Sequence, residues 1–377
     1  MSVEIHGHCD EKFARVKDTF AKNFEDGLDI GASVAVTVEG ENVVDLWAGT
    51  LVDADNKEWQ KDTIVNVWST TKTMAATVML MLADRGLLDF NQKVCTYWPE
   101  FAQNGKENIQ VRHIMSHSAG LSSLDEPIVF EDFCDHDKIA TLLAAQAPWW
   151  EPGTQSGYHA ITQGHMQNEI VRRITGKTLG TFFKEEVTDP LGADFHIGTP
   201  SSAYPRIGLL LPPEPAADAG IDPDSIMART MTRPALDALV SRTNSWREAE
   251  IPAANGHGNA RSVARIHSAI ACGGEVDGVR LMSKEGCRKI FEVQTDGDDL
   301  VLGTPVRFGM GFGINSEYQP LSPNKNVCYW GGWGGSLAVI DMDAKMSFAY
   351  VMNRMLSGTT GDMRAANLLM PLYGSIG

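Results

Sequence analysis

A serine and a lysine three residues apart, Ser69 and Lys72, stand at the start of a long apolar run at 74–83. Residues i and i+3 lie on one face of a helix, so the Lys72 amine can reach the Ser69 hydroxyl if the run is helical. Serine needs a neighbouring base to act as a nucleophile, and lysine becomes a base where burial lowers its pKa. A helix N-terminus also offers backbone N–H groups to a developing oxyanion. The pattern therefore predicts acyl transfer through a covalent intermediate on Ser69.

The Ser-x-x-Lys spacing alone is weak evidence, so its surroundings decide its meaning. The same spacing recurs at 322–325, where a proline and an asparagine predict a turn and no helix follows. Before Ser69, by contrast, a strand-like segment at 63–68 leads directly into the predicted helix. The alternative is that Ser69 is an ordinary helix cap and Lys72 a solvated residue, although a cation there opposes the helix dipole.

The Ser-Thr-Thr-Lys motif at 69–72, in this strand-to-helix setting, resembles that of the serine β-lactamase and penicillin-binding protein superfamily. The resemblance covers nearly the whole chain. Other segments similar to superfamily motifs are His-Ser-Ala-Gly-Leu at 117–121, Glu-Pro-Gly-Thr-Gln-Ser-Gly-Tyr at 151–158, Ile-Thr-Gly-Lys at 174–177, Asp-Pro-Leu-Gly at 189–192 and Trp-Gly-Gly-Trp-Gly-Gly-Ser at 330–336. Within the superfamily, the chain most resembles the class C β-lactamase-like esterases, the family VIII carboxylesterases.

This resemblance implies a catalytic group of Ser69, Lys72 and Tyr158. Either Lys72 or Tyr158 would be the base, because coupled groups titrate as a unit and the sequence does not separate them. The backbone N–H groups of Ser69 and Trp333 would form the oxyanion hole. The substrate pocket would draw on six further residues: Trp330, Gly331, Gly332, Trp149, Trp150 and His159. The alternatives are a packing role for the tyrosine and a simple turn for the glycine-rich segment.

Two departures from the superfamily pattern bear on the substrate. The usual Tyr-x-Asn is Tyr158-His159-Ala160 here, and Trp330 stands where the superfamily has the cationic lysine of Lys-Thr-Gly. Losing that cation removes a charge-assisted bond to a β-lactam carboxylate, so both changes favour a neutral ester.

The resemblance thus implies hydrolysis of short-chain carboxylic esters through an acyl-enzyme, with no metal or other cofactor. An acyltransferase using the same acyl-enzyme, a weak β-lactamase or D-amino-acid peptidase, and an inactive binding module remain as alternatives. The α/β-hydrolase fold is not indicated, because the Gly-x-Ser-x-Gly elbow is absent from the sequence.

Composition limits the remaining possibilities. The chain has 377 residues, 43% of them hydrophobic, which is enough for a large core and two domains. A formal charge of −16 argues against nucleic acid or an anionic membrane as a partner, leaving a small-molecule ester as the expected one. The first residues show no signal-peptide pattern, so a cytoplasmic location is expected.

The six scattered cysteines are expected to be free thiols that mostly fill the core. The oligomeric state is not indicated.

The predicted elements place strands at both ends of the chain and helices between them. We expect helices at 8–26, 163–174, 179–187, 256–271 and 362–373, and strands at 32–38, 43–47, 309–314, 327–330, 336–340 and 346–352. The segment 200–255 is expected to be a lid or rim. The fold class is therefore α+β, β-lactamase-like: an antiparallel sheet flanked by helices, with an inserted mainly helical domain. Residues 1–80 and 250–377 would form a discontinuous α/β domain and 81–249 the insertion, with the catalytic cleft at the seam.

Overall fold

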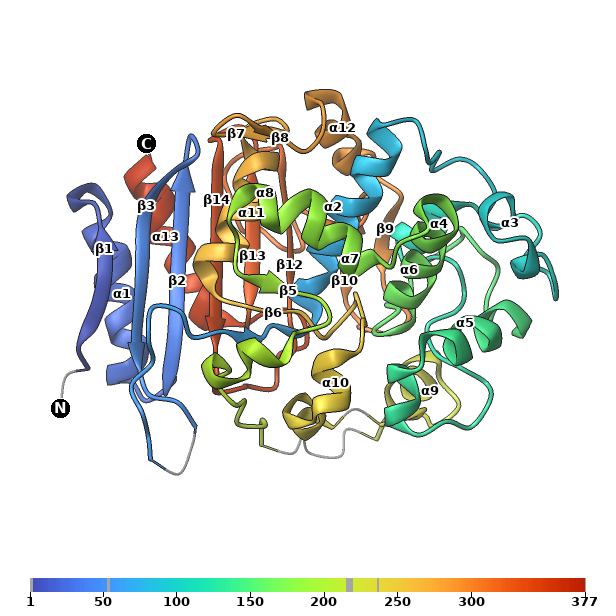
Figure 1. Ribbon diagram of the computed structural model, residues 1–377, viewed down its shortest axis with the longest axis horizontal. Coiled ribbons are helices and arrows are strands. Elements are labelled where there is room, and N and C mark those ends of the chain that lie inside the picture. Colours follow the sequence, from blue (N-terminus) through green and yellow to red (C-terminus); the bar gives the residue numbers. More distant parts are fainter. Residues whose placement is uncertain (1–2, 53–54, 215–219, 236, 377) are drawn as a thin grey trace.

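The computed structural model describes residues 3–52, 55–214, 220–235 and 237–376, and a nine-stranded sheet is its centre (Figure 1). Every neighbouring pair of its strands is antiparallel. In spatial order the strands are β1 (Ile5–Cys9), β3 (Glu41–Gly49), β2 (Gly31–Val38), β14 (Met346–Met352), β13 (Leu337–Asp341), β12 (Val327–Gly331), β11 (Gly313–Ile314), β10 (Pro305–Phe308) and β9 (Thr295–Asp298). The two ends of the chain meet where β2 pairs with β14, for example Ala35 with Ala349. The predicted antiparallel sheet with flanking helices is confirmed.

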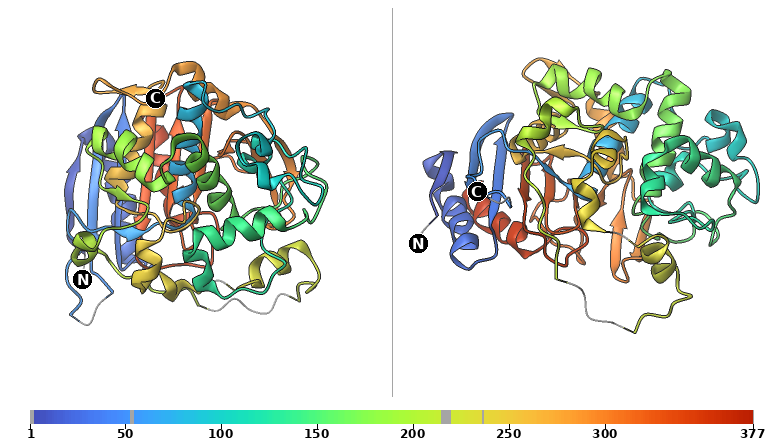
Figure 2. Two further views of the ribbon diagram at one scale, coloured as in Figure 1. Left: turned by 45° about the vertical axis from the view of Figure 1, so that its right-hand side comes forward. Right: turned by 60° about the horizontal axis from the view of Figure 1, so that its bottom comes forward.

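Helices cover both faces of this sheet (Figure 2). On one face lie α1 (Ala14–Glu25) and α13 (Met363–Ile376), which pack against each other. On the other face α11 (Ala260–Ala271) packs against β2, β13 and β14. With helices on both sides, β2 is almost fully buried, which explains its continuous run of small and β-branched residues.

The helix that follows Ser69 is α2 (Thr71–Asp84), and it is buried along nearly its whole length. A helix that is apolar all round belongs in a core, and α2 packs against β12 and against helices from both halves of the chain. It ends beside Gly86, whose φ of +70° is the left-handed conformation that favours glycine after a helix. The central position of α2 fixes its N-terminal turn against the inner strand β12.

Between α2 and α11 the described residues are mostly helix and turn. The helices there are α3 (Val94–Tyr97), α4 (Val111–Met115), α5 (His136–Ala145), α6 (Thr162–Thr175), α7 (Leu179–Phe183), α8 (Asp189–Leu191), α9 (Ile226–Thr232) and α10 (Asn244–Glu248). A small sheet joins this region to the segment before Ser69, in the order β4 (Val65–Asn66), β6 (His257–Gly258) and β5 (Phe195–His196). Outside both sheets lie the hairpin of β7 (Glu275–Val276) and β8 (Val279–Arg280) and the helix α12 (Lys284–Arg288).

Several predicted boundaries are wrong. The segment expected as a helix at 8–26 begins as the end of strand β1, and helical structure starts only at Glu11. The helix expected from 256 starts at Ala260, because 257–258 form β6 and Asn259 caps the helix by accepting from the Ser262 N–H. Of the strand expected at 309–314, only Gly313–Ile314 pairs in the sheet. The segment 200–255, expected as a lid or rim, contains α9 and α10, and its residues 215–219 and 236 lie outside the described residues.

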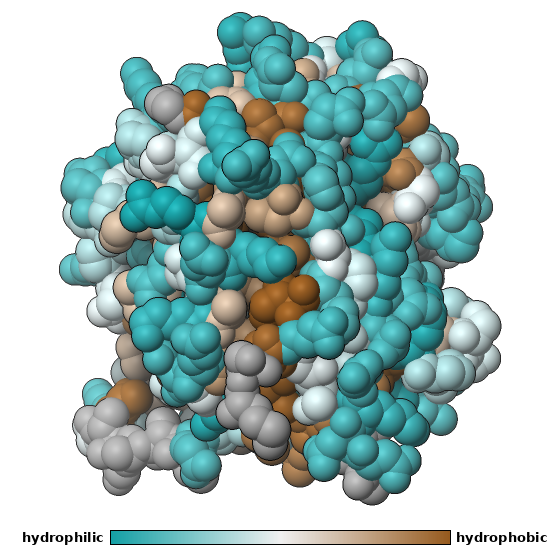
Figure 3. All heavy atoms as spheres, turned by 90° about the vertical axis from the view of Figure 1, so that its left-hand side faces the viewer, coloured by the Kyte–Doolittle hydropathy of each residue, from teal (hydrophilic) through white to brown (hydrophobic). Residues whose placement is uncertain are grey.

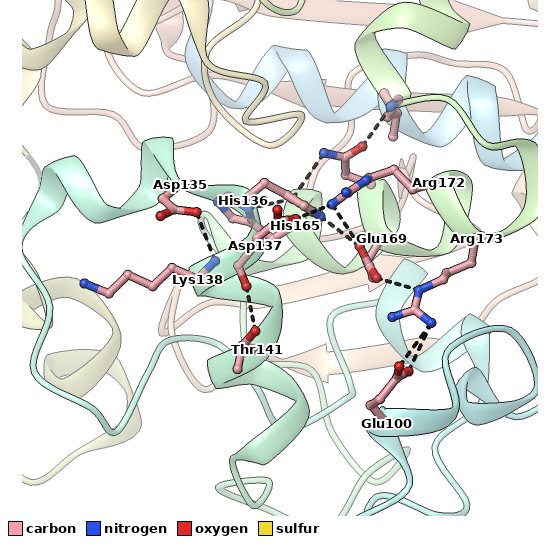
Figure 4. A network of polar contacts seen from close by, with 12 residues as sticks. Glu100, Asp135, His136, Asp137, Lys138, Thr141, His165, Glu169, Arg172 and Arg173 are labelled. Atoms are coloured by element: carbon pink, nitrogen blue, oxygen red, sulfur yellow. Dashed lines mark hydrogen bonds and ion pairs between the residues drawn. The ribbon is translucent and has the colours of Figure 1, made fainter.

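A buried carboxylate joins α5 to α6 (Figure 4). Glu169 accepts from His136 at 3.1 Å and from Arg173 at 2.7 Å, and Arg172 lies 3.3 Å away. The hydrogen bond from His136, with the help of Arg173, lowers the pKa of Glu169 to about 2. Figure 4 also shows Arg173 reaching Glu100, so the network ties three separate segments together.

The surface on the β1 side of the molecule differs in hydropathy between its middle and its periphery. Figure 3 shows that face covered mostly by hydrophilic side chains, with apolar ones gathered in a band near its middle. The edge strand β1 is five residues long, and short polar edge strands are protected against pairing with other chains.

None of the helices in the described ranges is long and apolar enough to cross a membrane. All six cysteines are free, as expected; Cys287 and Cys328 lie in the core, and the half-buried Cys9 and Cys134 pack against it.

Candidate active site

Ser69 lies in a tight 3₁₀ turn, Trp68–Thr70, that leads into α2, and 8% of its surface is exposed. Trp68 has a φ of +47°, a strained conformation for a bulky residue that persists only where the surrounding structure enforces it. The Thr71 hydroxyl donates to the Trp68 carbonyl at 2.5 Å, which helps to hold this turn. Ser336 braces the same turn, because its hydroxyl donates to the Val67 carbonyl at 2.8 Å. The turn therefore presents Ser69 at a fixed place at the helix N-terminus.

Lys72 is buried, and its amine has three oxygen neighbours. Nζ lies 3.3 Å from the Ser69 Oγ, 2.6 Å from the Ala160 carbonyl and 2.9 Å from the Ala253 carbonyl. Within the described part of the chain no carboxylate pairs with it, and burial lowers its pKa well below the usual value. A neutral amine has two protons, which the two carbonyls accept, and its lone pair then faces the Ser69 hydroxyl. This arrangement can remove the serine proton.

Tyr158 completes the group of three. Its ring lies 4.7 Å from the Lys72 Nζ, and its hydroxyl oxygen accepts from the Trp330 indole N–H at 3.3 Å. Burial raises the pKa of the phenol well above its usual value, although hydrogen bonds with Ser69 and Trp330 oppose this. The phenol therefore keeps its proton at neutral pH and can donate it. The structure brings Ser69, Lys72 and Tyr158 together.

The Gly332–Trp333 peptide lies close to the Ser69 backbone. The Gly332 carbonyl accepts from the N–H groups of Gly335 at 3.2 Å and Gly361 at 3.3 Å. Because N–H and C=O point in opposite directions across a trans peptide, the Trp333 N–H points away from that support. Neither the Trp333 N–H nor the Ser69 N–H has a hydrogen-bond partner among the described residues. A Cβ on Gly332 would lie 3.2 Å from the Ser69 nitrogen and 2.2 Å from the Val67 carbonyl oxygen, so only glycine allows this approach.

Comparison with known proteins identifies the family of this site. A family model described as Beta-lactamase matches residues 20–369. The chain belongs to the Beta-lactamase family.

Similar proteins agree with this assignment. The chain is 36% identical over 368 residues to an esterase/beta-lactamase, LipL, from Mycobacterium tuberculosis, covering 94% of this chain and 84% of that protein. A crystal structure of a family VIII carboxylesterase superposes with a TM-score of 0.92 at 41% identity, covering 99% of this chain and 100% of that one. A penicillin-binding protein homolog from Caulobacter crescentus has the same TM-score at 36% identity and the same coverage. The resemblance seen in the sequence is confirmed, and the chain is a hydrolase of β-lactamase fold.

In this Beta-lactamase family chain, the residues expected in the pocket lie in different places. Trp330 is buried against the Tyr158 ring at 5.3 Å, and the half-buried Trp333 packs edge-on against Trp68 at 5.1 Å. Gly331 lies against the backbone of Thr360, because a Cβ there would lie 2.3 Å from the Thr360 carbonyl oxygen.

The other three expected pocket residues are held by nearby loops. The Trp149 indole donates to Asp125 at 2.9 Å, and the Trp150 indole donates to the Gln155 carbonyl at 3.0 Å. The ring of His159 is fully buried, with Nδ1 on the Gly157 carbonyl at 2.6 Å and Nε2 accepting from the Leu121 N–H at 3.0 Å. Both ring nitrogens are thus used by the backbone.

Sequence reasoning missed residues that hold Tyr158 in place. The Asp299 carboxylate accepts from the Tyr158 N–H at 2.9 Å, and His117 Nδ1 accepts from the His159 N–H at 3.0 Å. His117 was noted only as part of a motif, and Asp299 stands in an ordinary acidic turn. No local pattern marks either contact, because both depend on segments far apart in the chain.

Proposed function

We propose that this protein is a serine hydrolase that cleaves short-chain carboxylic esters through an acyl-enzyme on Ser69. The observation that carries the proposal is the buried amine of Lys72, which no carboxylate of the described residues pairs with and which lies between two carbonyls and the Ser69 hydroxyl. A serine with such a base beside it is an activated nucleophile.

The steps follow from the contacts. Lys72 takes the Ser69 proton while Oγ attacks the ester carbonyl, and the N–H groups of Ser69 and Trp333 stabilise the oxyanion that forms. The ester C–O bond then breaks as Tyr158 gives its proton to the departing alkoxide, and the Lys72 ammonium returns a proton to Tyr158. Water attacks the acyl-enzyme in the same geometry, which releases the carboxylic acid and restores the Ser69 hydroxyl.

The side chains around Ser69 favour an uncharged substrate. Trp330 offers an indole N–H, already given to Tyr158, where a β-lactam carboxylate would need a cation. The half-buried Trp333, packed on Trp68, adds apolar surface next to the Ser69 turn. β-Lactam hydrolysis is the second candidate, because the relative LipL is described as an esterase/beta-lactamase and the acylation step would be the same.

Active-site labelling tests the proposal. Wild type and Ser69→Ala would be assayed with p-nitrophenyl acetate and butyrate, and the wild type labelled with a p-nitrophenyl phosphonate and mapped by mass spectrometry. We expect hydrolysis that Ser69→Ala abolishes and a label on Ser69. Ser322→Ala, which alters the other Ser-x-x-Lys spacing, is the matched control and should remain active.

The same assays separate the alternatives. Unchanged hydrolysis in Ser69→Ala, or a label on another serine, would refute the mechanism. Nitrocefin turnover comparable to ester turnover would make β-lactams the better substrate class. A shift of product toward acyl transfer when an alcohol is added would indicate an acyltransferase.

A further inference from the structure

Three successive backbone N–H groups around Tyr158 are all held from outside their own segment. The Gly157 N–H donates to the His117 carbonyl at 2.9 Å, and the His159 N–H donates to His117 Nδ1 at 3.0 Å. Between them, the Tyr158 N–H donates to Asp299 Oδ1 at 2.9 Å. Ordinary loops leave such groups to water, so this complete pairing fixes the backbone from which the phenol projects.

Asp299 is an unusual partner for this task, because its carboxylate is buried, with 2% of the residue exposed. Its Oδ1 accepts two further N–H groups, from Val301 and Leu302, each at 2.9 Å. Its Oδ2 is buried without a hydrogen-bond partner in the described part of the chain. An amide oxygen could accept the same three bonds, although more weakly than a carboxylate does. What the carboxylate adds beyond those bonds is a buried charge next to the Tyr158 segment.

The charge acts on few neighbours. The titratable groups facing Tyr158 are Lys72 from α2, His117 from the 113–121 turn, His159 from its own segment, and Asp299. Burial lowers the pKa of both histidines, that of His159 to about 3, so these rings stay neutral. Asp299 and Lys72 are then the two groups facing the phenol whose charges bear on its proton.

We propose that Asp299 is a positioning residue for Tyr158 that also sets the proton balance of the Lys72–Tyr158 pair. It holds the Tyr158 backbone through Oδ1 and presents a buried negative charge to the pair. A negative charge favours the Lys72 ammonium and disfavours a Tyr158 phenolate, so it keeps protons on both groups. This inference rests on the proposed function, in which that pair moves the Ser69 proton.

An isosteric variant separates charge from position. Asp299→Asn retains an oxygen for the three N–H groups and removes the charge, whereas Asp299→Ala removes both. For Asp299→Asn we expect the acid limb of the kcat/KM profile to move to lower pH by roughly 0.5 to 1 unit, because deprotonation of either partner becomes easier. Its plateau rate should stay near that of wild type. For Asp299→Ala we expect the plateau kcat to fall by roughly 10-fold or more, as the tyrosine loses its fixed place.

The control is Asp298→Asn, which makes the same charge change at the neighbouring exposed residue and should leave the profile unmoved. An Asp299→Asn profile that superimposes on wild type would overturn the electrostatic role. A plateau loss in Asp299→Asn as large as that in Asp299→Ala, with an unmoved limb, would reduce Asp299 to a structural residue.

The rate at which the phosphonate labels Ser69 would be measured against pH on the same variants. This second readout needs no ester turnover. If wild type labels Ser69 but hydrolyses no ester, the proposed substrate is wrong, and the labelling profiles still decide the role of Asp299.

Discussion

Lys72 donates to the backbone carbonyl of Ala253, 181 positions further along the chain, at 2.9 Å. The Ala160 carbonyl accepts a second hydrogen bond from the same amine. The amine thus has two hydrogen-bond acceptors beside it, and neither has a full negative charge. Carbonyl groups accept hydrogen bonds without neutralising an ammonium, so burial is left to lower the pKa. The base is therefore created by backbone atoms from two distant segments.

Changing Lys72 tests this base directly. Lys72→Met removes the amine, and Lys72→Arg keeps a cation that does not lose its proton in proteins. Both should lower kcat/KM for p-nitrophenyl butyrate by about 10³-fold or more. Lys72→Met should unfold at the same or a higher temperature, since it removes a buried ionisable amine that no carboxylate of the described residues pairs with.

Lys106 provides the matched control. It is also fully buried, its amine donates to the carbonyls of Gln103 and Gln146, and burial lowers its pKa to about 8. It contacts none of the site residues, so Lys106→Met should retain esterase activity. An active Lys72→Arg, or a Lys106→Met as inactive as Lys72→Met, would contradict the assignment.

The pH dependence of the reaction should show one acid limb. Below its pKa the Lys72 ammonium has no lone pair, so the rate rises with pH as the amine becomes neutral. Because the pKa of Lys72 is lowered, this limb should lie well below the usual 10.5. The pKa of Tyr158 is raised, so the phenol should not ionise on the neutral plateau. Profiles of kcat/KM between about pH 5 and pH 10 check both statements.

Tyr158→Phe separates the contributions of Lys72 and Tyr158 to that pH profile. Without the phenol proton the leaving alkoxide is not protonated, and the plateau should fall by about 10²-fold. The acid limb should persist, because Lys72 remains. Loss of the limb along with the plateau would show that the tyrosine is the base.

Gly332→Ala probes the oxyanion hole. The added Cβ would lie 2.2 Å from the Val67 carbonyl oxygen, so the backbone beside Ser69 must shift. Displacing one donor of such a hole typically costs about 10²–10³ in kcat. Gly374→Ala in α13, where a Cβ would meet no atom of the described residues within 4 Å, is the control and should be as active as wild type. Hydrolysis of p-nitrophenyl acetate measures both, and a fully active Gly332→Ala would show that the loop does not serve the oxyanion.

The elements predicted correctly from the sequence are those whose pattern is local. The helix after Ser69 is a continuous apolar run, and β14 is a continuous buried one, so each can be recognised alone. The strands β1 and β9 were missed because they lie at the two sheet edges and carry polar residues and glycines. Their pairing depends on a partner strand, not on an apolar alternation of their own.

The same distinction holds in the active site. The side chains of Ser69, Lys72 and Tyr158 stand in motifs that can be read from the chain. The carbonyls of Ala160 and Ala253 cannot, because any residue type supplies a carbonyl and only the fold decides which one faces the amine.

The buried carboxylate of Glu169 gives a prediction about stability (Figure 4). The hydrogen bond from His136, with that of Arg173, lowers its pKa from 4.5 to about 2, so its contribution to stability is complete above about pH 4.5 and disappears as pH falls through about 2. Glu169→Gln should cost roughly 1 to 2 kcal/mol at neutral pH, after allowance for solvent screening, and the cost should shrink on acidification. Glu185→Gln breaks an exposed ion pair with Lys177 and should cost much less. Thermal unfolding between about pH 3 and pH 7 measures both variants. A Glu169→Gln difference that does not change with pH would show that the carboxylate contributes by packing alone.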